Sequence, residues 1–94
     1  MRVKWLRKAL TSLDEAAEYI AKDNPEAARL LVAEVFRQTD LLAGYSEMGR
    51  PGRVLGTREL IMSDYPYIIP YRVRRGAVEI LRVFHSARRW PVSV

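Results

Sequence analysis

The sequence contains no cysteine, and its longest apolar runs are short. The absence of cysteine excludes a disulfide framework and a thiolate metal site, and it is typical of proteins from a reducing compartment. The N-terminal stretch MRVKWLRKAL lacks the apolar core of a signal peptide, and no run is long enough to cross a membrane. We therefore expect a cytoplasmic protein without membrane contact, metal or cofactor.

Lysine is absent from the chain after Lys22, although the formal net charge is +5. Residues 1–47 hold seven basic and eight acidic residues and so carry −1, whereas residues 48–94 hold nine arginines and three acidic residues and carry +6. Arginine without lysine favours planar, bidentate recognition of carboxylate or phosphate groups. The structural alternative is that these arginines are solvated charges on strands and turns.

The first half of the chain predicts a short strand followed by two helices. MRVKW alternates weakly and indicates the strand. Apolar residues then recur every three or four positions, as on one face of a helix. These are Leu6, Leu10, Leu13, Ala17 and Ile20. After Lys22, Asn24 is a suitable N-cap and Pro25 a suitable first residue for a second helix that ends near Gly44. The short connection predicts an antiparallel hairpin.

The second half predicts three strands, because TRELIMS, YIIPYRV and AVEILRVFH are rich in β-branched and aromatic residues and are separated by turns. Pro70 has no N–H to donate, so we expect an irregularity there. Alternation places one set of side chains in the last run on one face and the rest on the other. The first set is Val78, Ile80, Arg82 and Phe84, and the second is Glu79, Leu81, Val83 and His85. The predicted class is α+β, with one domain over residues 1–94.

This order of elements resembles the RelE/ParE superfamily of toxins from bacterial type II toxin–antitoxin modules, and ParE-like members in particular. The resemblance covers essentially the whole chain and rests on AAEYIAKDNPEAARLL, MGRPGRVLGTREL, YPYIIPYRV and VEILRVFHSARRWP. It implies a plasmid-stabilisation toxin that a small cognate antitoxin of the ParD or RelB kind neutralises. It also implies that operator DNA is contacted only through the antitoxin.

Two activities occur within the superfamily. RelE-like members cut mRNA on the ribosome, which requires proton transfer and cations for the phosphorane charge, whereas ParE-like members poison DNA gyrase by binding. For a nuclease, the candidate catalytic residues are Arg58, Arg82 and His85. His85 is the only histidine, however, and Trp90 stands where the RelE pattern has a tyrosine. We therefore favour gyrase poisoning without catalytic residues and keep the ribosome-dependent endonuclease as the alternative.

A second alternative is a non-catalytic RNA-binding module, which the arginines allow although no aromatic stacking platform is evident. For target binding we expect arginines and one aromatic anchor to supply the contacts. These residues are Arg50, Arg53, Arg58, Arg82, Arg88, Arg89 and Trp90. The structural alternatives are solvated loop charges for Arg50 and Arg53, surface ion pairs for Arg58 and Arg82, and a lid over the helices for Trp90.

Overall fold

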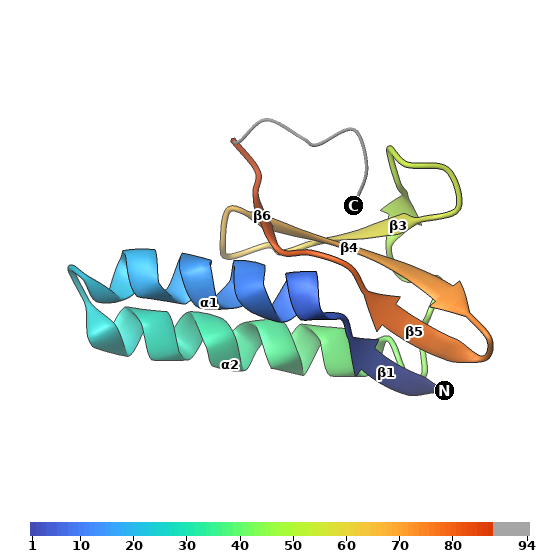
Figure 1. Ribbon diagram of the computed structural model, residues 1–94, viewed down its shortest axis with the longest axis horizontal. Coiled ribbons are helices and arrows are strands. Elements are labelled where there is room, and N and C mark those ends of the chain that lie inside the picture. The colour runs from blue at the N-terminus through green and yellow to red at the C-terminus, as the bar shows by residue number, and fades with distance from the viewer. Residues whose placement is uncertain (88–94) are drawn as a thin grey trace.

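The computed structural model describes residues 1–87, in which two helices pack against one face of a mixed sheet (Figure 1). The elements are β1 (Arg2–Trp5), α1 (Arg7–Ala21), α2 (Pro25–Leu41), β2 (Arg50–Pro51), β3 (Arg58–Ile61), β4 (Tyr67–Arg74), β5 (Ala77–Ile80) and β6 (Phe84–His85). The strand order is β1-β5-β4-β3-β2, and β6 pairs with β4. Only the β1–β5 pairing of this described sheet is parallel. The predicted α+β class is confirmed, with β2 as an additional short strand.

The helix hairpin forms where the sequence predicts it. The Asn24 side chain accepts the N–H of Ala27 at 3.1 Å, and Pro25 begins α2. The predicted inward stripe of α1 is partly wrong, because Leu10 is 44% exposed whereas Ala9 and Leu13 are buried. Two overlapping stripes on α1 both fit a helical period, so the packing of the helix against the sheet decides between them.

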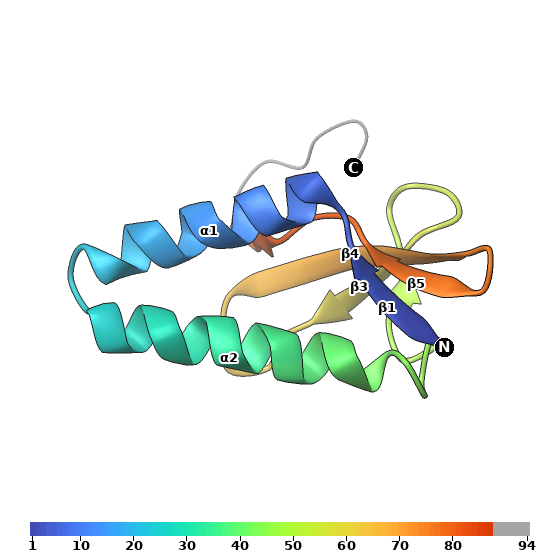
Figure 2. The ribbon, with the colours of Figure 1, turned by 60° about the horizontal axis from the view of Figure 1, so that its bottom comes forward.

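The core lies between the helix hairpin and the inner face of the sheet (Figure 2). Its buried members are Ala9, Leu13, Leu31, Val35, Leu42, Leu60, Met62, Tyr67, Ile69, Tyr71, Val78, Ile80 and Val83. Trp5 of β1 packs against Phe36 of α2 with 4.9 Å between the ring centroids. The shared apolar stripe of the helices is thus covered by β1, β3, β4 and β5, and by residues just before β6.

Pro70 lies within β4, and the irregularity it predicts falls on the facing strand. Its carbonyl accepts the N–H of Leu81 at 2.9 Å, but the reciprocal bond cannot form because proline has no N–H. The pairing register with β4 differs by one residue between β5 and β6, so residues 81–83 form a bulge. The predicted single strand over residues 77–85 is therefore wrong.

The bulge also corrects the predicted faces of this segment. Ile80 pairs with core residue Tyr71, whereas Phe84 pairs with Ile68 on the outer face. Val83 consequently joins the core. One inserted residue is enough to reverse the alternation, because side chains in a strand have a period of two.

The hydroxyl of Tyr71 ties residues 46–49 to the sheet. It accepts the N–H of Gly49 and donates to the carbonyl of Ser46, both at 2.8 Å. Tyr71 is fully buried, and this burial raises the pKa of its hydroxyl, which stays protonated and able to donate. The phenol thereby satisfies two backbone groups that approach the core.

Tyr71→Phe is expected to destabilise the fold by about 1 to 3 kcal/mol, because it leaves these two backbone groups without their partner. Thermal unfolding followed by circular dichroism measures the effect, at roughly 4 to 8 °C for each kcal/mol. Tyr45→Phe is the matched control, since Tyr45 is 68% exposed. Equal melting temperatures for both variants and the parent chain would show that the bridge adds no stability.

Candidate functional site

The segment from Arg50 of β2 to Glu59 of β3, which holds three arginines, is organised around a buried carboxylate. Glu59 is 1% exposed, and its Oε1 accepts from Nε and Nη2 of Arg50 at 3.1 and 2.9 Å. Its Oε2 accepts the backbone N–H of Arg53 at 2.8 Å. Because these donors satisfy both oxygens, the charge of Glu59 can remain buried. Arg50 thus fixes the start of the loop to β3 through Glu59.

Backbone contacts stiffen the tip of the same loop. The N–H of Gly52 donates to the carbonyl of Thr57 at 2.8 Å, and Gly56 has a φ of 82°, which favours glycine. A Cβ at Gly52 would lie 2.1 Å from Oγ1 of Thr57, so no larger residue fits without rearrangement. The loop presents Leu55 with its side chain fully exposed.

Arg58 of β3 also contacts the protein itself. Its Nη1 donates to the carbonyl of Gly49 at 2.8 Å and to that of Glu47 at 3.4 Å. Together with Tyr71, Arg58 holds the segment before β2 against the sheet. The expected ion pairs of Arg58 are replaced by these carbonyl contacts, and Glu59 pairs with Arg50.

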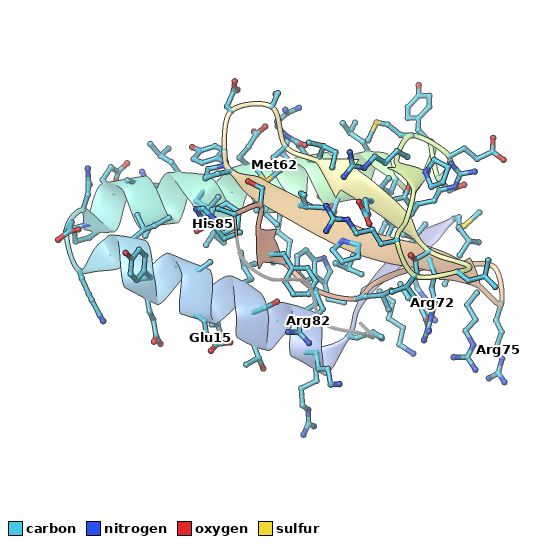
Figure 3. The ribbon with its side chains drawn as sticks, turned by 90° about the horizontal axis from the view of Figure 1, so that it is seen from above. Glu15, Met62, Arg72, Arg75, Arg82 and His85 are labelled. Atoms are coloured by element: carbon cyan, nitrogen blue, oxygen red, sulfur yellow. The ribbon has the colours of Figure 1, made fainter. Side chains whose placement is uncertain are left out.

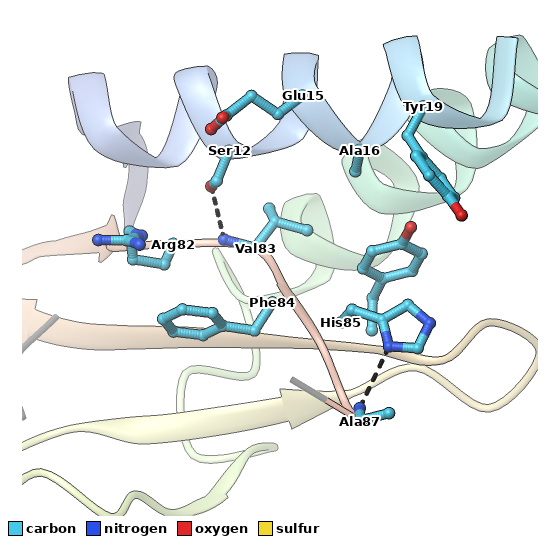
Figure 4. Close-up of a pocket in the computed structure, with 10 residues that line it drawn as sticks. Ser12, Glu15, Ala16, Tyr19, Arg82, Val83, Phe84, His85 and Ala87 are labelled. Carbon is cyan, nitrogen blue, oxygen red and sulfur yellow. Dashed lines mark hydrogen bonds between the residues drawn. The ribbon is translucent and has the colours of Figure 1, made fainter. Parts of the chain in front are cut away.

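A groove runs between α1 and the last strand (Figure 4). It has a volume of about 490 Å³. It is lined by Ser12, Glu15, Ala16, Tyr19, Tyr67, Arg82, Val83, Phe84, His85 and Ala87. Ser12 Oγ accepts the N–H of Val83 at 2.8 Å, which joins α1 to the bulge beside the groove that both residues line.

Arg82 and His85 are the titratable residues that the last strand brings to this groove. The Arg82 guanidinium carbon lies 4.9 Å from the centroid of the Phe84 ring, within cation–π range. Its Nε is buried and has no hydrogen-bond partner among the described residues. His85 Nδ1 accepts the N–H of Ala87 at 3.2 Å, which places the proton of a neutral ring on Nε2. This Nε is shielded from solvent, so the outer part of the guanidinium is what Arg82 can present to the groove.

Comparison with known proteins assigns the chain to a family. A family model described as the ParE toxin of the type II toxin-antitoxin system, parDE, matches residues 3–90. The chain belongs to this toxin family. The RelE/ParE resemblance inferred from the sequence is therefore confirmed, and the partner that a type II toxin implies is an antitoxin.

Individual relatives agree with the family of the toxin. The present chain is 51% identical over 90 residues to Y4kP, a candidate toxin of Sinorhizobium fredii (strain NBRC 101917 / NGR234). The matched region covers 96% of this chain and 93% of the relative. It is 37% identical over 87 residues to Toxin RelE2 of Caulobacter vibrioides, covering 93% and 97%. A solved structure described as the chromosomal ParDE TA system from P. aeruginosa superposes with a TM-score of 0.81 at 33% identity, covering 90% and 95% of the two chains.

In the toxin, the three candidate catalytic residues do not gather at one point. Arg82 and His85 share the groove, whereas Arg58 faces the carbonyls of Gly49 and Glu47. In the strand register, Arg58 lies opposite Tyr71 and His85 lies opposite Tyr67. Tyr67 and Tyr71 are four residues apart along β4. That separation is about 13 Å along the strand. Arg88, Arg89 and Trp90 lie outside the described residues.

Sequence reasoning missed the contribution of α1 to the groove. Ser12, Glu15 and Tyr19 lie at positions i, i+3 and i+7, and this spacing places them on one face of the helix. That spacing is visible in the sequence, but the polar character of the three residues favoured a solvated face. After the bulge at residues 81–83, the side chains of the last strand alternate in the opposite sense, and His85 lies on the groove that these three α1 residues line.

Residues 1–87 contain no group of three or more histidine, aspartate or glutamate side chains arranged to hold a metal ion. Among the described helices, neither is both long enough and apolar enough to cross a membrane.

Glu59→Gln is expected to destabilise the toxin by about 1 to 3 kcal/mol, because the amide cannot accept all three hydrogen bonds and turns an NH₂ toward donors. Urea unfolding gives the free-energy difference. Glu26→Gln is the control, since Glu26 pairs with Arg29 on the exposed surface of α2 and its side chain is 61% exposed. If both variants unfold like the parent, Glu59 does not organise the loop.

Proposed function

We propose that the toxin poisons DNA gyrase by binding it. The observation that carries this proposal is the separation of the candidate catalytic residues. The Arg58 guanidinium is held by two backbone carbonyls, and it lies about 13 Å along β4 from the strand position of His85. A ribonuclease needs its proton-transfer groups and its cations around one phosphate. Poisoning by binding needs no such arrangement.

The target-facing surface in this proposal includes the loop at residues 52–57 and the arginines predicted from the sequence. Hydrogen bonds within the loop hold the backbone that presents Leu55 to solvent, and a backbone ordered in advance loses less conformational entropy when it binds. Arg50 keeps about half of its side-chain surface exposed although it pairs with Glu59. Arg53 follows it in the same loop. These groups would supply an apolar contact with charged neighbours.

The antitoxin is the second partner, and we place one of its segments in the groove between α1 and the last strand. Arg82 brings a cationic side chain to the lining of this groove, and Tyr19, which also lines it, is 66% exposed. Aromatic and arginine side chains are enriched among strong interface contacts. An antitoxin arm in this groove would bind in the nanomolar range or tighter, about −12 kcal/mol or stronger.

An mRNA endonuclease of the RelE type is the second candidate, because Arg82 and His85 do share one groove. A relative named Toxin RelE2 also shares 37% of the matched sequence. In that function His85 would transfer a proton while Arg82 balanced the phosphate charge. The two candidates differ in what they demand of His85.

The purified toxin is expected to inhibit gyrase supercoiling and to leave mRNA on translating ribosomes uncut. His85→Ala should change the inhibitory concentration by no more than about threefold, since a substitution away from a contact changes free energy by about 0.5 kcal/mol or less. Folding is checked by circular dichroism and by thermal unfolding. A folded His85→Ala protein that has lost toxicity by several orders of magnitude would establish the nuclease instead.

Removal of residues 88–94 tests the proposed target contacts of Arg88, Arg89 and Trp90. We expect the shortened chain to bind antitoxin but to lose gyrase inhibition, because two arginines and a tryptophan are typical of binding hot spots. If Trp90 is instead a lid, the melting temperature falls by roughly 4 to 8 °C for each kcal/mol lost. A truncated toxin that is fully stable and fully inhibitory would refute both roles.

A further inference from the structure

The β4–β5 hairpin and the start of β1 project past the helices (Figures 1 and 2). Five basic residues lie in these segments. They are Arg2, Lys4, Arg72, Arg74 and Arg75, and we call them the hairpin patch. Figure 3 shows Arg72 and Arg75 at this end of the sheet, with His85 toward the other end. One carboxylate, Glu79, lies among them, which leaves a formal charge of +4.

The strand register explains why these residues converge. Arg2 and Arg74 both pair with Ala77, one from each neighbouring strand, while Lys4 and Arg72 both pair with Glu79. Residues paired directly across strands share a face of the sheet. Each basic pair therefore flanks β5 with about 10 Å between the backbones, twice the strand spacing. The short side chain of Ala77 lies in a hollow of about 360 Å³ between the cations.

The cations exceed what the protein itself can neutralise. Arg72 Nε donates to Glu79 Oε1 at 2.7 Å. This bond and the charges of Arg72, Arg74 and Lys4 lower the pKa of the Glu79 carboxyl, which remains ionised. The side chains of Arg2, Lys4, Arg74 and Arg75 have no hydrogen bond or ion pair to any residue in the 1–87 range. Four cations are thus available to an anionic ligand.

Arg75 occupies a backbone conformation that rarely suits arginine. Its φ is 53°, and that of Gly76 is 73°, so both residues of the hairpin turn are left-handed. Turns of this kind favour asparagine or glycine at the first position, because a longer side chain is strained there. An arginine at this position costs stability, and such an outlier favours a functional requirement for its charge.

We propose that the hairpin patch binds the phosphate backbone of a nucleic acid. Guanidinium groups bind phosphate oxygens in a bidentate manner, and backbone binding requires little besides clustered cations. A protein interface, in contrast, normally has an apolar centre. The hollow is lined by charged side chains and by Ala77, and thus has no such centre. This contact is independent of gyrase binding, and it gives the toxin a nucleic-acid contact of its own in addition to any through the antitoxin.

Fluorescence anisotropy of the full-length toxin with labelled random-sequence duplex DNA and, separately, with single-stranded RNA tests the proposal. We expect micromolar or weaker binding that falls as salt rises from about 50 to 200 mM. The Arg74→Ala, Arg75→Ala double variant should reduce the slope of log affinity against log salt by about 2, one for each lost phosphate contact. The nucleic acid that binds more tightly identifies the preferred backbone.

The matched control is the Arg29→Ala, Arg37→Ala double variant, which removes two charges from exposed positions on α2. It should keep the parent slope. An equal loss of nucleic-acid affinity in both double variants would mean that net charge alone determines binding, and the proposal would be wrong. It would also be wrong if the patch variant kept its nucleic-acid affinity and lost affinity for the antitoxin instead. Neither result depends on the gyrase assay.

Arg75→Asn separates binding from folding, because asparagine tolerates the left-handed conformation. We expect this variant to have a higher melting temperature than the parent and yet to bind nucleic acid more weakly, with the slope reduced by about 1. Unchanged affinity in a more stable protein would contradict a role for Arg75 in the patch.

Discussion

The backbone nitrogen of Pro70 carries no hydrogen, and this missing donor shapes the end of the sheet. Pro70 accepts a hydrogen bond from Leu81 but cannot return one, and beyond this bond the last strand leaves the ladder until Phe84. The strand resumes with its register shifted by one residue. Val83 is then part of the core, and the ring centroids of His85 and Tyr67 are 5.4 Å apart. Val83 and His85, whose positions follow this shift, both line the groove along α1.

The sequence predicted the features that local chemistry determines. Asn24 and Pro25 mark the start of α2 by capping and by backbone restriction, both of which act over a few residues. Two features could not be predicted in the same way. They are the face of α1 that packs inward and the face of the sheet on which each side chain after residue 81 lies. Both depend on contacts with distant segments, such as the bond between Ser12 and Val83. The site is therefore less predictable than the fold, since it forms where the regular period is interrupted.

Charge shows the same distinction between composition and arrangement. The excess of arginine in the second half predicted recognition of carboxylate or phosphate groups, but the structure gives these arginines different roles. Arg50 and Arg58 hold the segments around β2, through Glu59 and through backbone carbonyls. The cations of the hairpin patch come from both halves of the chain, because the parallel pairing of β1 with β5 brings Arg2 and Lys4 beside the hairpin. Net charge per half could not indicate this pairing.

The groove and the hairpin patch lie at opposite ends of β4. His85 pairs with Tyr67 at the first residue of β4, and Arg74 is its last residue, which places the two about 23 Å apart along the strand. The nearer members lie closer together, because Leu81, next to Arg82 of the groove, bonds to Pro70, two residues before Arg72 of the patch. No residue that lines the groove belongs to the hairpin patch, however. An antitoxin segment in the groove would leave the patch exposed. If both proposals are right, the same small sheet would bind a protein segment along α1 and an anionic backbone at the hairpin, through separate sets of residues.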